Sequence, residues 1–224
     1  MSVFTTGPNA DGMIDPDKEG VSAIELIDPY DLFGSWFGEA RQKEPNDPNA
    51  MTLATVDDDG TPSARMVLLK DFGSRGFVFY TNYASRKGQA LHDNPAAALL
   101  FHWKSLRRQV RIEGDVVPVD PTDADAYFAS RARGSRIGAW ASLQSQPLDS
   151  RETLKQRVAE LEQQYGTQDD IPRPPHWSGF RVVPRRIEFW EDMPFRLHNR
   201  MVFTADPSVT EGPVKGWRTE RLYP

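Results

Sequence analysis

The residues best suited to chemistry in this 224-residue chain are cations that flank apolar segments. In the segment RMVLLK, Arg65 and Lys70 stand at the two ends of an apolar run. A β-strand would direct these two side chains to opposite faces, because side chains alternate along a strand. Two cations placed in this way either mark the ends of a buried strand or bind two separate anions. The residue types are compatible with both interpretations.

The segment YTNYASRKGQ indicates an anion site more sharply. Arg86 and Lys87 fall in the first turn of an expected helix, directly after a strand that ends at Tyr80 and Thr81. A helix N-terminus carries free N–H groups and the positive end of the helix dipole, so two cations there cost free energy unless an anion balances them. We therefore favour a phosphate site here over a solvated helix start.

The segment RLHNR is the most unusual of the chain, because Arg196, His198 and Arg200 alternate in it. An extended backbone would direct all three side chains to one side. Two guanidinium groups beside an imidazole do not form a core face without anionic partners, and Trp190 nearby offers a wall for a planar ligand. Gln109, in a β-prone segment, offers amide donors and an acceptor for the edge of a heterocycle.

Several common kinds of site are missing from the sequence. The chain has no cysteine and therefore no thiol nucleophile, and its four histidines lack the spacing of metal ligands, so we expect no metal. Nucleotide-binding glycine motifs, zinc-protease motifs and nucleophile elbows are also missing. No apolar run reaches the roughly 18 residues of a membrane helix, and no signal peptide is visible. We expect a cytoplasmic protein without a membrane partner.

The charge of the chain is distributed unevenly. The net charge is −5, yet residues 1–64 carry 13 acidic and 3 basic residues, whereas residues 65–133 carry 7 acidic and 11 basic residues. An acidic chain with a basic middle fits a confined anionic ligand better than a long polyanion, so we expect no nucleic-acid partner. A solvated charged surface would explain the same counts.

These residues need elements that position them. Residues 1–22 are polar and aperiodic, which predicts a flexible N-terminal arm, and residues 23–224 are expected to form one domain. Closely spaced strands interleaved with helices predict an α+β fold with an antiparallel sheet or barrel. One expected helix follows Asp28-Pro29. The other expected helices span Ser85–His92, Thr122–Ser130, Ser135–Leu143 and Arg151–Tyr165. The expected strands are Met51–Val56, Arg65–Lys70, Gly76–Asn82, Ala96–Trp103, Arg108–Val119, Phe180–Val183, Arg186–Glu191, Met201–Thr204 and Trp217–Leu222.

Six ordered segments resemble one protein family, the pyridoxine/pyridoxamine 5′-phosphate oxidases. They are RMVLLK, YTNYASRKGQ, LRRQVRIEG, YFASRARGSRIGAWASLQS, PHWSGFRVVPRRIEFW and RLHNR, and the similarity runs from about Trp36 to the C-terminus. The resemblance implies an antiparallel split β-barrel with flanking helices, which binds FMN at the interface of a homodimer. It also implies oxidation of pyridoxamine and pyridoxine 5′-phosphate to pyridoxal 5′-phosphate, with O2 as electron acceptor and H2O2 as product.

The resemblance also assigns residues to the two ligands. By the family pattern, Arg196 and His198 are catalytic and face the pyridine ring of the substrate. FMN would contact Arg65, Met66, Val67, Leu68, Leu69, Lys70, Tyr80, Thr81, Arg86, Lys87, Gln109, Gln144, Ser145, Trp190 and Arg200. The substrate would contact Lys70, Tyr127, Arg131, Ser135, Arg196, Leu197 and His198.

Two other functions are compatible with the same residues. One is a different split-barrel oxidoreductase that uses FMN or a deazaflavin. The other is a non-catalytic protein that binds a flavin or pyridoxal phosphate. The oxidase is favoured because Arg131 and Ser135, together with Arg196 and His198, would recognise the pyridoxal substrate rather than the flavin.

Overall fold

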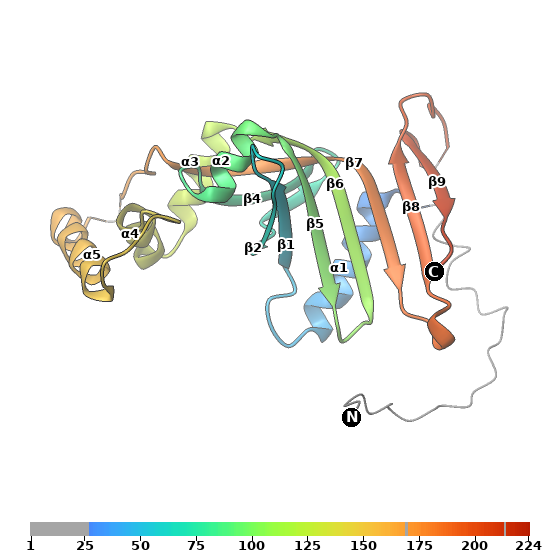
Figure 1. The fold of residues 1–224 in the computed structure, drawn as a ribbon, viewed down its shortest axis with the longest axis horizontal. Helices are drawn as coiled ribbons and strands as arrows, with labels where there is room; N and C mark the ends of the chain where they lie inside the picture. The colour runs from blue at the N-terminus through green and yellow to red at the C-terminus, as the bar shows by residue number, and fades with distance from the viewer. Residues whose placement is uncertain (1–26, 169, 213) are drawn as a thin grey trace.

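The fold is known from a computed structural model that describes residues 27–168, 170–212 and 214–224. The expected arm, residues 1–22, lies outside the described residues. The described strands form one antiparallel sheet in the order β2-β1-β5-β6-β7-β4-β3, with β8 on β7 and β9 on β8 (Figure 1). The strands are β1 (Ala50–Val56), β2 (Pro62–Leu68), β3 (Asp71–Gly73), β4 (Gly76–Asn82), β5 (Ala96–Trp103), β6 (Arg108–Pro118), β7 (Trp177–Glu191), β8 (Asn199–Ala205) and β9 (Trp217–Arg221). The helices are α1 (Pro29–Lys43), α2 (Arg86–Asp93), α3 (Pro121–Ser130), α4 (Arg133–Ala141) and α5 (Arg151–Tyr165), and a 3-10 turn spans Pro194–Arg196.

Strand β7 divides the sheet, because its two halves pair with different strands along one edge. On the other edge β6 follows almost its whole length. On the divided edge, β4 pairs with residues 177–182 and β8 pairs with residues 186–191. This branching produces the curled, split sheet and confirms the expected antiparallel α+β fold.

The division of β7 coincides with a β-bulge. Gly114 pairs with Pro184 and Glu113 with Arg186, so Arg185 is the extra residue on β7. A Cβ on Gly114 would come within 2.0 Å of the Val183 carbonyl oxygen. The backbones of β6 and β7 can therefore lie this close together only because residue 114 is a glycine. The sequence predicts two strands here because a proline interrupts the pattern. That prediction is wrong, since the bulge accommodates the proline within one strand.

Helix α1 covers the apolar face of the sheet. Its start is set by Asp28, whose carboxylate accepts a hydrogen bond from the Tyr30 N–H at 2.8 Å, and by Pro29 in the first turn. Phe33 is fully buried and meets the rings of Phe77 and Phe101 edge-on, at centroid distances of 4.9 and 5.1 Å. The helix expected after Asp28-Pro29 is therefore confirmed.

Helices α3, α4 and α5 gather at one end of the molecule, and the β8–β9 hairpin lies at the other (Figure 1). A second apolar cluster holds these helices to the start of β7, with Phe128, Ile137 and Trp177 at its centre. The cluster fixes the end of α3 beside β4.

The longest described helices have 15 residues, and none of those described has the length and apolar character to span a bilayer.

Candidate functional site

A cavity of about 680 Å³ lies where β2 and β4 meet α2, α3 and α4. Three cations line it, namely Lys70, Lys87 and Arg131, and no described residue of its lining is acidic. We call it the cationic cavity. Uncompensated positive charge in a concave site attracts an anion. Eleven of the residues predicted from the sequence line this cavity: Met66, Val67, Leu68, Lys70, Tyr80, Thr81, Lys87, Tyr127, Arg131, Ser135 and Gln144.

Strand β2 lines this cavity with its last three residues, Met66, Val67 and Leu68. Met66 and Leu68 are exposed, whereas Arg65 and Val67 on the other face are half-buried, so the predicted alternation is confirmed. The strand ends at Leu68, two residues before the predicted end. The Arg65 guanidinium does not line the cavity; it donates to the Leu53 carbonyl, Thr55 and Ser63 at 3.2, 2.8 and 2.6 Å.

Three stacked aromatic rings form one wall of the cationic cavity. The Tyr80 ring lies 4.0 Å from the Tyr127 ring and 5.3 Å from the Trp177 ring. The Arg131 guanidinium lies 4.7 Å from the Trp177 ring, and Lys70 Nζ lies 6.0 Å from the Tyr127 ring. Burial lowers the pKa of Arg131, and its buried Nη1 has no hydrogen-bond partner within the described residues. An unpaired buried donor beside a cavity suits an acceptor oxygen of a ligand.

The start of α2 supplies the third cation. Ser85 caps the helix by accepting from the Gly88 N–H, so Arg86 and Lys87 fall in the first turn as predicted. Lys87 Nζ donates to Gln144 Oε1 at 2.8 Å, which links α2 to the segment after α4. Burial, and then the charge of Arg65, lower the pKa of Lys87. Both effects disfavour the charged ammonium in the free chain, and a bound anion would oppose them.

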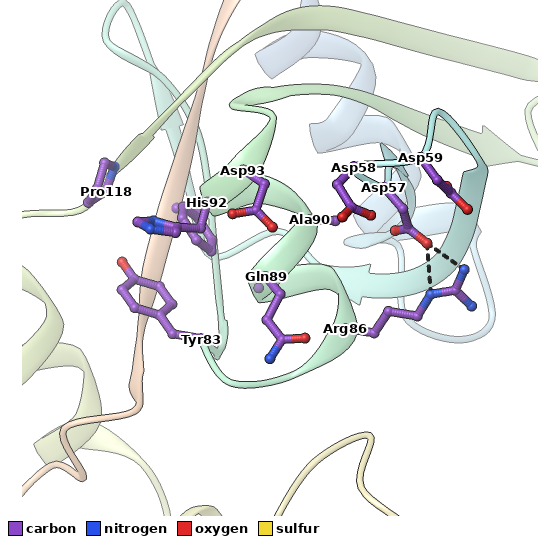
Figure 2. A pocket seen from close by; sticks show the side chains of 12 residues that line it. Asp57, Asp58, Asp59, Tyr83, Arg86, Gln89, Ala90, His92, Asp93 and Pro118 are labelled. Carbon is purple, nitrogen blue, oxygen red and sulfur yellow. Dashed lines mark hydrogen bonds and ion pairs between the residues drawn. The ribbon is translucent and has the colours of Figure 1, made fainter.

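Arg86 has a different environment from its neighbour. Figure 2 shows its guanidinium turned toward Asp57 in the β1–β2 turn, with Nη2 and Nε at 2.5 and 3.0 Å from the carboxylate. It lines a separate cavity of about 600 Å³ together with Asp58 and His92.

Two further predicted residues, Ser145 and Leu69, do not line the cationic cavity. Ser145 is exposed with φ of 71°, and Leu69 is buried in the core. A ligand role for these residues stays a prediction.

A second group of predicted residues lies on β6, β7 and β8. Gln109 pairs with Trp190 across β6 and β7, and Trp190 pairs with Arg200 across β7 and β8. Directly opposed residues project to the same face of a sheet, so the three side chains form one row. They line a cavity of about 270 Å³ together with Arg111 and Glu188.

Glu188 organises this row and is absent from the residues predicted from the sequence. The residue is 4% exposed, and its carboxylate accepts from Arg200 Nε at 2.8 Å and from Arg111 Nη2 at 2.5 Å. Arg186 adds a third contact at 3.3 Å. A buried carboxylate needs such cationic partners. The signal that could have found it is a glutamate placed between apolar residues in the strand pattern IEFW.

The connection from β7 to β8 carries the remaining predicted residues. His198 packs against Trp190 with ring centroids 4.6 Å apart. Arg196 belongs to a 3-10 turn and has φ of 62°, after Phe195 with φ of 58°. The prediction of an extended segment with Arg196, His198 and Arg200 on one side is therefore wrong, because Pro194 starts a turn. Leu197 is exposed.

Within one chain the two groups of predicted residues remain apart. The cationic cavity and the cavity around Trp190 share no lining residue. The first lies near α3 and α4, and the second lies on the strands that lead to the β8–β9 hairpin (Figure 1).

Comparison with known proteins gives the family of the chain. Residues 37–165 match the family described as pyridoxamine 5′-phosphate oxidase. Residues 177–224 match the pyridoxine 5′-phosphate oxidase C-terminal dimerisation region. The chain belongs to the pyridoxamine 5′-phosphate oxidase family. The resemblance drawn from the six sequence segments is thereby confirmed.

Relatives within this family cover most of the chain. A pyridoxine/pyridoxamine 5′-phosphate oxidase of Caulobacter vibrioides is 63% identical over 197 residues, which cover 88% of this chain and 85% of the relative. The Brucella canis protein of the same name is 58% identical over 200 residues, with coverages of 89% and 96%.

Solved structures share the fold. PhzG from Burkholderia lata 383, in complex with tetrahydrophenazine-1-carboxylic acid, superposes with a TM-score of 0.80 at 30% identity and covers 96% of this chain and 98% of its own. A pyridoxamine 5′-phosphate oxidase-related, FMN binding protein from Nostoc punctiforme PCC 73102 has a TM-score of 0.69 at 17% identity, with coverages of 88% and 98%. The second likeness concerns the fold alone.

Proposed function

We propose that this chain is an FMN-dependent oxidase that converts pyridoxamine and pyridoxine 5′-phosphate to pyridoxal 5′-phosphate, with O2 as electron acceptor and H2O2 as product. Oxidation of the amine also consumes one water and releases ammonia. The observation that carries the proposal is the cationic cavity, in which three cations meet no acidic residue of the described lining. Relatives with this activity in their name, at 58% and 63% identity, support the same substrate class.

The residues present fit FMN, which carries a phosphate and a flat ring system with one apolar and one polar end. The Lys87 ammonium, with its pKa lowered by burial and by Arg65, would gain a counterion in a phosphate. Thr81 and Gln144 add a hydroxyl and an amide in the same lining. When bound, FMN supplies a hydride acceptor that O2 can reoxidise. The protein contributes position and electrostatics.

We assign the phosphate of the substrate to Lys70, Tyr127, Arg131 and Ser135. The unpaired Arg131 Nη1 and the Lys70 ammonium provide the charge, and the stacked rings give a rigid wall. Binding energy from a phosphate remote from the reacting carbon then orients that carbon. Arg196 and His198 would face the pyridine ring and hold its polar groups.

A homodimer would complete the site. One chain keeps Gln109, Trp190 and Arg200 apart from its own cationic cavity, and the C-terminal dimerisation region contains Trp190 and Arg200. We propose that a partner copy places these residues, together with Arg196 and His198, against the cationic cavity of the first chain. FMN would then lie at the subunit interface.

The test uses the purified protein under air. We expect the absorbance of an oxidised flavin, and added pyridoxamine 5′-phosphate should yield pyridoxal 5′-phosphate and an equal amount of H2O2. Flavin without product would indicate a different split-barrel oxidoreductase. Tight binding of pyridoxal 5′-phosphate without turnover would indicate a carrier protein. Either of these two results would contradict the proposal.

A further inference from the structure

A carboxylate outside the predicted site lies directly against His198. Asp192 Oδ1 is 2.9 Å from His198 Nδ1, and the two side chains are 17% and 19% exposed. Asp192 follows the end of β7, and His198 precedes the start of β8. The pair therefore spans the base of the turn that contains Phe195 and Arg196, whose φ values of 58° and 62° are unusual for residues other than glycine.

The β5–β6 turn fixes Asp192 from the other side. The Asp192 N–H donates to the Arg107 carbonyl oxygen at 3.0 Å, and the Arg107 guanidinium forms an ion pair with the Asp192 carboxylate. The Trp190 ring packs on the imidazole of His198 at 4.6 Å. Backbone, charge and ring contacts thus hold the carboxylate and the imidazole in one arrangement.

Two groups compete for the same ring nitrogen. The Met193 N–H donates to His198 Nδ1 at 3.2 Å, and Asp192 Oδ1 lies 2.9 Å from the same nitrogen. A neutral imidazole has one N–H and one acceptor nitrogen, so Nδ1 either donates to Asp192 or accepts from Met193. The hydrogen bond that one ring nitrogen makes decides the role of the other nitrogen.

We infer that Asp192 is a positioning residue for His198: its carboxylate accepts the hydrogen bond of Nδ1–H and leaves Nε2 as the acceptor of the ring. The inference rests on the proposed function for its consequence, which is that Nε2 accepts a hydrogen bond from an amine or hydroxyl group of the substrate. A charge-assisted bond at a fixed carboxylate is stronger than one with a backbone N–H, which is why Asp192 prevails over Met193.

The position of the ring proton tests this directly in the FMN-loaded protein. Imidazole ¹⁵N spectra, recorded where the ring is neutral and assigned by loss of the His198 signals in His198→Gln, should show the proton on Nδ1. In Asp192→Ala the proton should move to Nε2, because Met193 N–H becomes the partner of Nδ1. Asp192→Asn keeps an acceptor oxygen and should keep Nδ1–H. A wild-type ring protonated on Nε2 would overturn the inference.

Kinetics supply the second readout. Asp192→Ala should lower kcat about tenfold and change KM by less than about twofold, with most of the rate restored in Asp192→Asn. In a His198→Gln background, Asp192→Ala should cause no further loss, because the two residues act as one unit. An equal loss in both backgrounds would indicate a purely structural role and would overturn the inference.

A matched control is available in the turn at the other end of β8. Asp206 lies in the turn after β8, where it accepts from Ser208, so Asp206→Asn also removes one carboxylate and should leave kcat unchanged. Failure of the proposed function is distinguishable from failure of the inference. An FMN-loaded wild-type protein that does not oxidise the substrate contradicts the function, whereas the ring spectrum still decides the role of Asp192.

Discussion

At the scale of single residues, the orphaned donor of Arg131 is the most informative feature of the cationic cavity. Its Nη1 is buried beside the stacked rings and lacks a protein acceptor within the described residues. Such a group costs free energy unless a ligand satisfies it. The substrate phosphate is the acceptor that the proposed function supplies.

We therefore expect Arg131→Ala to raise the KM for pyridoxamine 5′-phosphate strongly. One hydrogen bond to a charged group contributes about 1.5–3 kcal/mol, or roughly 10- to 150-fold in affinity. Flavin absorbance should not change, because Arg131 is assigned to the substrate. Arg185→Ala, which removes an exposed arginine on β7, is the control and should leave KM unchanged.

Pyridoxamine without its phosphate separates the two roles of this residue. Wild-type protein and Arg131→Ala should oxidise this poor substrate at similar rates, since the lost contact is absent from both reactions. A comparable defect with both substrates would place Arg131 at the reacting carbon instead of at the phosphate.

Lys87 gives the cationic cavity a pH dependence. Burial and the charge of Arg65 lower its pKa below the usual 10.5, so the free chain loses this proton at a lower pH than an ordinary lysine would. FMN binding should weaken as pH rises through the lowered pKa, because the phosphate prefers the charged form. Burial raises the pKa of Tyr80 in the same lining, so its hydroxyl stays neutral in this range.

The stability of the FMN-free chain should change in the opposite direction. Between the lowered pKa of folded Lys87 and the usual value, the unfolded state binds more protons, so the free energy of unfolding rises with pH.

Fluorescence titration of FMN from about pH 7 to about pH 10 measures the expected loss of FMN affinity. Lys87→Arg should abolish the decline of FMN affinity with rising pH, because a guanidinium keeps its charge. A decline that persists in Lys87→Arg would assign it to another group.

At the scale of elements, the branching of β7 places both groups of site residues. Its first half carries Trp177 beside the cationic cavity, and its second half carries Glu188 and Trp190. The bulge opposite Gly114 is the point at which β7 changes neighbours. The close approach of backbone atoms at Gly114 should therefore control both stability and the site.

Gly114→Ala tests this role. The added Cβ would meet the Val183 carbonyl oxygen at 2.0 Å, and backbone atoms cannot move aside as a flexible side chain can. We expect a loss of about 2–4 kcal/mol in the free energy of unfolding, measured by denaturant titration at fixed protein concentration. Gly38→Ala in α1 meets no atom within 4 Å and should raise stability by up to about 1 kcal/mol. Similar effects of both substitutions would contradict the role of the bulge.

The sequence predicts elements better than it predicts their interruptions. Period-two and helical patterns correctly give the bounds of β4, β5 and α5. The short strand β3 is missed, since three residues carry no pattern. The turn at Pro194–Arg196 is also missed, because alternation of polar residues looks the same in a strand and in a turn. Side-chain partners such as Asp57 for Arg86 depend on contacts between distant segments, which no local pattern contains.

At the scale of the whole molecule, the family pattern names one site, but the single chain presents its residues in two places. Short motifs identify the residues, whereas under the proposed function their assembly depends on a second copy. The cavity around Trp190 already has its cations paired to Glu188, and the cationic cavity has an excess of positive charge. In the proposed dimer, these two surfaces supply different parts of one ligand site: the Trp190 surface forms a flat wall, and the cationic cavity binds the anion.

Complementation between two inactive variants tests this assembly. Arg131→Ala damages the cationic cavity and Arg200→Ala damages the row on β6, β7 and β8, so each homodimer should be inactive at low substrate concentration. In a mixed dimer, one site receives both intact surfaces and the other receives both defects. Random pairing makes about half of the dimers mixed, each with one working site of two, so coexpression should restore about a quarter of wild-type activity. Sites built within one chain would give no recovery, because every site would then carry one defect.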